Sequence, residues 1–137
     1  MSSEEKLQAL VGQLRAIESY LGDIDTKNSL SIRASAEARA SLEAVKTLTS
    51  SNVSDVLIPL GGGISIQSSV SKPKRLLVNV GAGITMEKRP AEAITLVEER
   101  IKDLETAIES LSSQRNDLTN QYNAMRATIN NLVENKG

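Results

Sequence analysis

The chain has 137 residues, of which 16 are basic and 17 acidic, and it contains no cysteine, no histidine and only two aromatic residues. The missing residues exclude thiol nucleophiles, imidazole acid–base catalysis, disulfides and the usual zinc sites. The balanced charge and the scarcity of aromatics argue against a nucleic-acid-binding surface. We therefore expect a protein that is not an enzyme, holds no metal or cofactor, and acts through exposed surfaces.

No targeting or membrane segment is visible in the sequence. No basic stretch followed by an apolar run opens the chain, so we expect no signal peptide. The longest apolar stretch, residues 56–66, contains Pro59 and three glycines. It is far shorter than the ~20 residues that span a bilayer. Because the absence of cysteine fits a reducing compartment, we predict a cytoplasmic protein that does not bind membranes.

The first predicted element is a long helix over about residues 3–50. Ser2 and Glu5 have the spacing of a capping box at its start. Apolar residues recur at alternating steps of three and four, which is the heptad pattern of a coiled-coil seam at positions a and d. The seam residues are Leu7, Leu10, Leu14, Ile17, Leu21, Ile24, Ala38, Leu42 and Val45. The same frame places polar or small residues in the middle, namely Asn28, Ser31 and Ser35.

An internal repeat follows the first helix. Residues 57–67 align with residues 77–87, and four of the eleven aligned positions are identical. Each copy has the pattern of a strand, a three-residue glycine loop and a strand, so we predict two β-hairpins over about residues 55–88. A phosphate-binding loop requires a helix directly after the glycines, whereas β-type residues follow here. Two hairpins bury little apolar surface and leave open edges, so this segment is expected to assemble with other chains.

The last predicted element is a second long helix over about residues 90–135, with Pro90 at the first helical position. Its seam residues are Ile94, Val97, Ile101, Leu104, Ile108, Leu111, Leu118, Tyr122, Met125, Ile129 and Leu132, with Arg115 as the one break. The two helices have similar lengths and flank a short β segment. We therefore expect them to pair with each other as an antiparallel coiled coil.

The register of this coiled coil has two solutions. In an antiparallel pair, a positions face d positions, so facing residue numbers add to a constant, here either 139 or 146. A sum of 146 places Arg115 opposite Ser31, whereas a sum of 139 places it opposite Ile24. We favour 146, because an unpaired charge against a small hydroxyl costs less than one against an apolar side chain.

The helix ends furthest from the hairpins have a widened apolar stripe. Val11 and Val133 lie at position e, directly beside the seam, and Met125 adds a flexible side chain that adapts to varied surfaces. An ordinary coiled-coil end explains the seam residues themselves. The wider stripe predicts an adhesive tip where the two chain ends meet.

The order helix, two hairpins, helix resembles the prefoldin family, specifically its archaeal-type α class. The most specific stretch is Val56-Leu57-Ile58-Pro59-Leu60-Gly61-Gly62-Gly63, followed by Val78-Asn79-Val80-Gly81-Ala82-Gly83-Ile84 and Glu87-Lys88. The resemblance covers essentially the whole chain. Within the family, two hairpins instead of one distinguish α-class from β-class subunits.

The resemblance implies a single α+β domain over residues 1–137, mostly α. Its long antiparallel coiled-coil hairpin would carry two central β-hairpins that join an intersubunit β-barrel, in a hexamer of two α and four β subunits. It also implies an ATP-independent chaperone, or holdase, that captures unfolded proteins at the tips and delivers them to a group II chaperonin. The implied client-binding residues are Leu7, Leu10, Val11, Leu14, Met125, Ile129, Leu132 and Val133. The implied assembly residues are Val56, Leu57, Ile58, Leu60, Ile64, Ile66, Leu76, Leu77, Val78, Val80, Ile84 and Met86.

A second hypothesis is a structural or tethering coiled-coil oligomer that binds no client. The two hypotheses differ at the tip, because a pure spacer has no use for Val11 and Val133 beside the seam. An enzyme is a distant third, since the sequence shows no convergent catalytic set.

Overall fold

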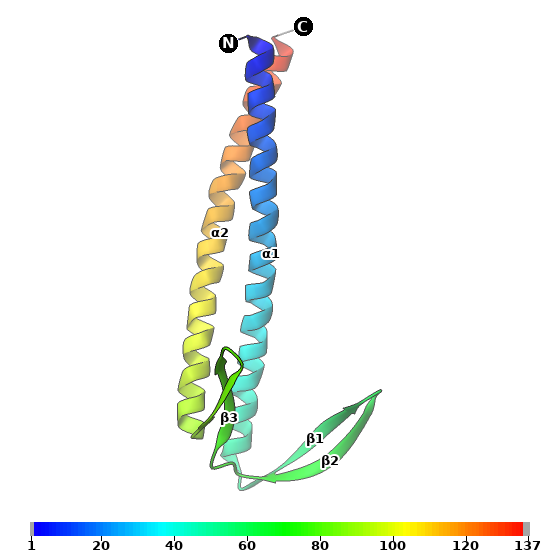
Figure 1. Ribbon diagram of the computed structural model, residues 1–137, viewed down its shortest axis with the longest axis vertical. Coiled ribbons are helices and arrows are strands. Elements are labelled where there is room, and N and C mark those ends of the chain that lie inside the picture. The colour runs from blue at the N-terminus through cyan, green and yellow to red at the C-terminus, as the bar shows by residue number, and fades with distance from the viewer. Residues whose placement is uncertain (1, 136–137) are drawn as a thin grey trace. The chain divides into compact units, whose positions relative to one another are not determined.

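The computed structural model describes residues 2–135 and has the expected order of elements (Figure 1). These are α1 (Ser3–Ser50), β1 (Val53–Gly61), β2 (Ile64–Ser71), β3 (Leu76–Gly81), β4 (Ile84–Lys88) and α2 (Pro90–Glu134). The fold class predicted from the sequence is confirmed, although β1 begins slightly earlier than expected. Among the described residues of this single chain, the strands form two separate two-stranded sheets and no closed barrel.

Local signals at the helix ends explain where the helices begin and stop. The Glu5 backbone N–H donates to the Ser2 hydroxyl over 3.2 Å, which is one half of the predicted capping box. At the other end of α1, the Thr49 and Ser50 hydroxyls donate to the carbonyls of Val45 and Thr47, over 2.8 and 2.7 Å. Such hydroxyl groups bond equally well outside a helix and therefore weaken it where they cluster.

The chain divides into two compact units, which we describe separately. Unit 1 comprises Met1–Arg33 and Leu104–Gly137, and therefore pairs the beginning of α1 with the end of α2. Unit 2 comprises Ala34–Asp103, and holds the remainder of both helices together with the two hairpins. Buried apolar residues mark the seam in each unit, at Ile17 and Ile24 in unit 1 and at Val97 and Ile101 in unit 2. Ala93, which is also buried, lies directly beside the seam.

The helix register in unit 1 follows from two side-chain contacts between α1 and α2. Arg115 Nε lies 2.8 Å from Asp25 Oδ1, and the Tyr122 hydroxyl donates to Glu18 Oε1 over 3.1 Å. In both pairs the residue numbers add to 140. That value fits a seam with facing numbers that add to 139, so the preference for 146 was wrong.

The wrong preference came from treating Arg115 as a buried charge. In the structure the Arg115 side chain leaves the seam, is 48% exposed, and pairs with Asp25 at the edge of the helix interface. A long side chain can cover apolar surface with its stem while its charged end stays in water. Placing Arg115 opposite Ile24 therefore costs much less than an unpaired buried charge.

The polar middle of the α1 seam begins inside unit 1 with Asn28. In the observed register, the heptad frame places Asn28 opposite Leu111. The Asn28 Oδ1 atom is buried and has no hydrogen-bond partner in the part of the chain that the structure describes. The seam thus contains one polar group whose loss of water is not compensated.

The two hairpins of unit 2 share one pattern of strand pairing. The apolar pair Ile58 and Ile66 in β1–β2 corresponds to the pair Val78 and Met86 in β3–β4. Each hairpin also has a register shift just before its turn, between Pro59 and Gly61 and between Asn79 and Gly81. The sequence repeat is therefore a structural repeat.

The turns of the hairpins are tighter than the predicted three-residue loops. Only Gly62 and Gly63 form the first turn, and Gly61 stays in the strand at the bulge with a φ of 94°. Gly62 and Gly63 also have positive φ, which two-residue turns of this kind require at both positions. In the second hairpin, Ala82 occupies the position of Gly62 with a φ of 52°.

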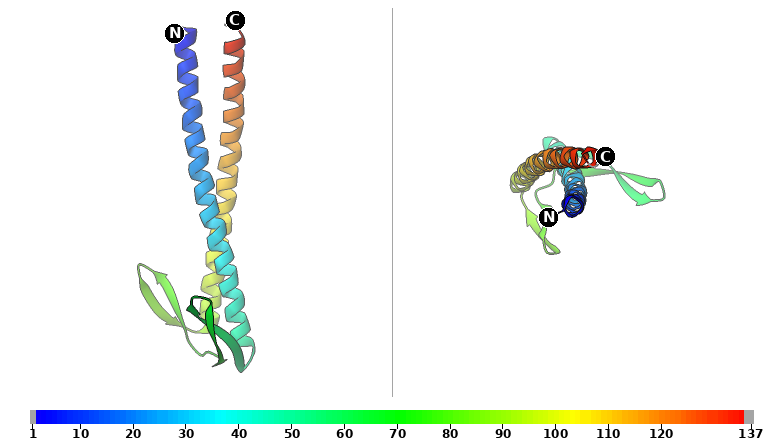
Figure 2. Two further views of the ribbon diagram at one scale, coloured as in Figure 1. Left: turned by 90° about the vertical axis from the view of Figure 1, so that its right-hand side faces the viewer. Right: turned by 90° about the horizontal axis from the view of Figure 1, so that it is seen from above.

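Two hydrogen bonds to backbone carbonyls hold the hairpins in place within unit 2. The Lys72 N–H donates to the Asn52 carbonyl over 2.7 Å and closes the base of the first hairpin. The Arg100 guanidinium donates to the Asn79 carbonyl and links the second hairpin to α2. The hairpins leave the base of the helices in different directions, as the view from above in Figure 2 shows.

Candidate interaction surfaces

The first candidate surface is the tip, which consists of the eight predicted client-binding residues at the ends of α1 and α2. These two ends lie at the same end of unit 1 (Figures 1 and 2). Seven of the eight side chains are partly buried, and Val133 is 53% exposed. Further along the same seam, Ile17 and Ile24 are each only 7% exposed. None of the eight tip residues is as well covered as Ile17 and Ile24.

The tip thus presents apolar side chains that residues 2–135 leave partly uncovered. Leu7 and Leu10 face Leu132 and Ile129 in the observed register, and Val11 and Val133 lie beside them. These side chains belong to the outer turns of both helices, since α1 begins at Ser3 and α2 ends at Glu134. The arrangement suits a weak contact with extended apolar segments, since Met125 and the leucines can change rotamer to fit different partners.

The second candidate surface is the hairpin surface, which consists of the twelve predicted assembly residues. Nine of them are exposed, with the largest fractions at Leu77 (73%), Leu57 (66%) and Ile64 (63%). Val56, Leu76 and Val78 are partly buried. Adjacent strand residues point to opposite faces, so the exposure of both Leu57 and Ile58 means that both faces of the first hairpin are uncovered. An apolar surface of this kind marks a protein–protein contact.

Sequence reasoning missed four exposed apolar residues, one on the first hairpin and three on α1. Val53 begins β1 and is 59% exposed, but it follows the polar segment that marks the end of α1 and was left out. Tyr20, Leu30 and Ile32 are exposed on α1. They lie outside positions a and d and away from the tip, so the heptad pattern did not point to them.

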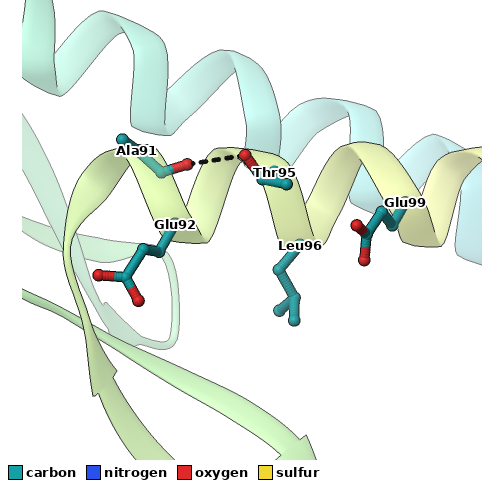
Figure 3. A pocket seen from close by; sticks show the side chains of 5 residues that line it. All are labelled: Ala91, Glu92, Thr95, Leu96 and Glu99. Carbon is teal, nitrogen blue, oxygen red and sulfur yellow. Dashed lines mark hydrogen bonds between the residues drawn. The ribbon is translucent and has the colours of Figure 1, made fainter.

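One hollow of the molecule lies against the first turns of α2. This hollow, of about 360 Å³ (Figure 3), is lined by Ala91, Glu92, Thr95, Leu96 and Glu99. The Thr95 hydroxyl is used locally, since it donates to the Ala91 carbonyl over 3.1 Å. Arg89 Nε donates to Glu92 Oε1 over 2.8 Å, and this bond lowers the pKa of the Glu92 carboxyl below its usual value. Glu92 therefore serves as the charged partner of Arg89 at the helix start.

Residues 2–135 contain neither a metal-ion cluster nor a membrane-spanning helix. No group of three or more acidic, histidine or cysteine side chains is placed to hold a metal ion. No helix in the same range has the length and hydropathy needed to cross a membrane. The two apolar surfaces are thus the features that require an explanation.

Comparison with known proteins identifies the family. A family model described as Prefoldin subunit matches residues 17–135. The chain belongs to the prefoldin family. Among its relatives, prefoldin subunit alpha of Nitrosopumilus maritimus is 30% identical over 96% of this chain and 91% of the relative. Prefoldin subunit alpha of Methanocorpusculum labreanum is 34% identical over 93% of this chain and 78% of the relative.

Solved prefoldin structures have the same fold. A chain of filamentous PFD from Methanocaldococcus jannaschii is 25% identical, covers 91% of this chain and 98% of its own length, and superposes with a TM-score of 0.57. The prefoldin beta subunit from Thermococcus strain KS-1 is 18% identical. The match covers 90% of this chain and 89% of the beta subunit, and the TM-score is 0.62. The chain is thus a subunit of a chaperone family, and both apolar surfaces lie on a prefoldin fold.

Proposed function

We propose that this prefoldin subunit is an ATP-independent holdase that captures unfolded polypeptides at its tip in the cytoplasm. The observation that carries the proposal is the incomplete burial of eight apolar side chains gathered at the tip, of which Val133 is 53% exposed, whereas Ile17 and Ile24 of the same coiled coil are buried. An unfolded chain exposes the apolar segments that such a surface binds. No nucleotide is needed, because binding and release follow from the weakness of each single contact.

Assembly supplies the strength that one tip lacks. The hairpin surface would pair with prefoldin β subunits, in a hexamer of two α and four β subunits held by an intersubunit β-barrel. Several tips held at one end of such an assembly bind one client together, which raises the effective concentration of each tip for the same chain. Delivery of the client to a group II chaperonin would complete the cycle.

A tethering coiled coil without client binding is the second candidate function. Tyr20 and Leu30 favour it, since they show that exposed apolar residues also occur away from the tip. They are single residues, however, whereas the tip combines eight apolar positions from two helices. A tether would also leave the widened stripe at Val11 and Val133 unused.

The deciding experiment compares tip and control variants in suppression of client aggregation. The tip variant replaces Leu10, Val11, Leu132 and Val133 with serine. The control replaces Tyr20 and Leu30 with serine, which removes exposed apolar surface from α1 outside the tip. Each variant is combined with the β partner, and light scattering follows aggregation of a denatured protein without ATP.

We expect the tip variant to lose suppression while its assembly stays intact, and the control to retain it. Circular dichroism and the mass of the assembly verify that both variants fold and associate. Full suppression by an intact assembly of the tip variant would contradict the proposal and move the client site elsewhere.

A further inference from the structure

Two heptad positions of unit 1 have matching sequence patterns. Position e of α1 has the order apolar, acidic, acidic, apolar, at Val11, Glu18, Asp25 and Ile32. Position a of α2, followed from its C-terminal end toward its start, has the order apolar, tyrosine, basic, apolar, at Ile129, Tyr122, Arg115 and Ile108. In the observed register each member of the first set lies beside the corresponding member of the second.

The two central pairs of this pattern are in direct contact. Arg115 Nε bonds to Asp25 Oδ1 over 2.8 Å, and the Tyr122 hydroxyl donates to Glu18 Oε1 over 3.1 Å. Both contacts are partly open to water, with Arg115 48% and Asp25 54% exposed. Exposed polar contacts contribute little to stability, so strength alone does not explain the pattern.

We propose that these two contacts select the register of the coiled coil. Sliding α2 by one heptad in one direction places Arg115 beside Ile32, where its charge has an apolar neighbour. Sliding by one heptad in the other direction places Tyr122 beside Val11. Each slide leaves a polar side chain against an apolar one, and only the observed register gives both polar groups an acidic partner.

The heptad seam cannot make this choice alone. After a shift of seven residues in one helix, a positions again face d positions, so the apolar seam fits the shifted partner almost as well. The connection between the helices is not a short turn that would fix the register by itself. It runs from Ser50, where α1 ends, through two hairpins to Pro90, where α2 begins, and such a long segment restrains the helix ends less than a tight turn would. Polar groups at the seam and charges beside it are known means of specifying register in coiled coils.

The register also determines how the tip is built, a consequence that rests on the proposed function. In the observed register, Leu132 faces Leu7 and Ile129 faces Leu10. In the alternative register, whose facing residue numbers add to 146, Leu132 would face Leu14. The first turns of α1, with Leu7 and Leu10, would then extend past the apolar end of α2. The same residues would form a different binding surface.

Introduced cysteine pairs can test the register directly, because the full chain contains no cysteine of its own. The native reporter carries Leu21→Cys and Leu118→Cys, which face each other in the observed register. Two shifted reporters, Leu21→Cys with Met125→Cys and Leu14→Cys with Leu118→Cys, face each other only after a slide of one heptad. The readout is the intramolecular disulfide formed after brief oxidation, measured by mass spectrometry.

With both contacts intact, we expect the native reporter to cross-link on the order of tenfold faster than the shifted ones, as suits a preference set by a few polar contacts. Adding Arg115→Leu and Tyr122→Leu should raise the shifted cross-links toward the native level. Asp25→Arg should also raise them, and its combination with Arg115→Asp should lower them again. The matched control removes one arginine and one tyrosine outside position a, through Arg126→Leu and Tyr20→Leu, and should change nothing.

Two results would overturn the proposal. Shifted cross-links that stay low after Arg115→Leu and Tyr122→Leu would mean that another feature sets the register. An equal rise in the control would mean that any loss of polar surface loosens the helices. The readout involves no client and no partner subunit, so either result leaves the holdase proposal to its own aggregation assay.

Discussion

At the scale of single residues, Asn28 and Arg115 show two fates of a polar side chain in an apolar seam. Arg115 is long enough to reach Asp25 at the edge of the interface, so its charge remains paired and partly hydrated. Asn28 is short, and its side-chain oxygen is buried without a hydrogen-bond partner among the described residues. The length of the side chain decides whether the polar group is compensated.

Replacing Asn28 with leucine should therefore stabilise the chain. The change removes a buried, unsatisfied oxygen and provides an apolar side chain opposite Leu111, which we expect to raise the free energy of unfolding by about 1–2 kcal/mol. Urea denaturation followed by circular dichroism measures the difference. Asn123→Leu, at an exposed position of α2, is the control and should have little effect. A drop in stability for Asn28→Leu would show that Asn28 has a favourable role that the structure does not reveal.

At the scale of elements, the two hairpins are copies that differ in one turn residue. Gly62 has a φ of 59°, and Ala82 has a φ of 52° at the matching position. Glycine adopts this left-handed conformation freely, whereas a residue with a Cβ is strained there. A Cβ built on Gly62 meets no atom within 4 Å, so the backbone conformation alone distinguishes the two turns.

Exchanging the turn residues should have opposite effects on the two hairpins. Ala82→Gly should stabilise β3–β4 and Gly62→Ala should destabilise β1–β2, each by roughly 0.5–1 kcal/mol, because strain relief is partly offset by the greater freedom of glycine in the unfolded chain. Amide hydrogen exchange of the strand residues reports each hairpin separately, with the other hairpin as internal reference. Slower exchange in β1–β2 after Gly62→Ala would contradict this account.

At the scale of the whole molecule, the hairpin surface cannot be satisfied within one chain. Each sheet has only two strands, and large apolar side chains such as Leu57 and Leu77 are mostly exposed. Two-stranded sheets of this kind have limited stability in water and expose edges that pair with other strands. A complete core for unit 2 therefore requires other subunits.

We accordingly expect that the purified chain does not remain a monomer, and that it forms a hexamer only when a β-class prefoldin subunit is present. Light scattering coupled to size-exclusion chromatography measures the mass with and without that partner. A matched variant with Leu57→Ser and Leu77→Ser should fail to form the hexamer, because it removes the two most exposed apolar side chains of the hairpin surface. A stable, folded monomer that ignores the β subunit would contradict the expectation.

The sequence by itself determined the elements and both apolar surfaces. Heptad spacing identified the helices, and a repeat ending in glycines identified the hairpins, because helix period and positive φ are properties of neighbouring residues. The same local patterns placed Val11 and Val133 beside the seam and Leu57 and Leu77 on strands. Residues outside these patterns, such as Leu30 and Ile32, were not found.

Only the tertiary structure decided the register, the form of the turns and the state of each polar group. A heptad pattern repeats every seven residues, so it fits several registers almost equally well. The contact of Arg115 with Asp25 on the other helix shows which register the helices adopt. The bulge at Gly61 depends on pairing with β2, and the unsatisfied oxygen of Asn28 depends on what packs against it. These features arise between segments far apart in the chain, where local sequence patterns carry no information.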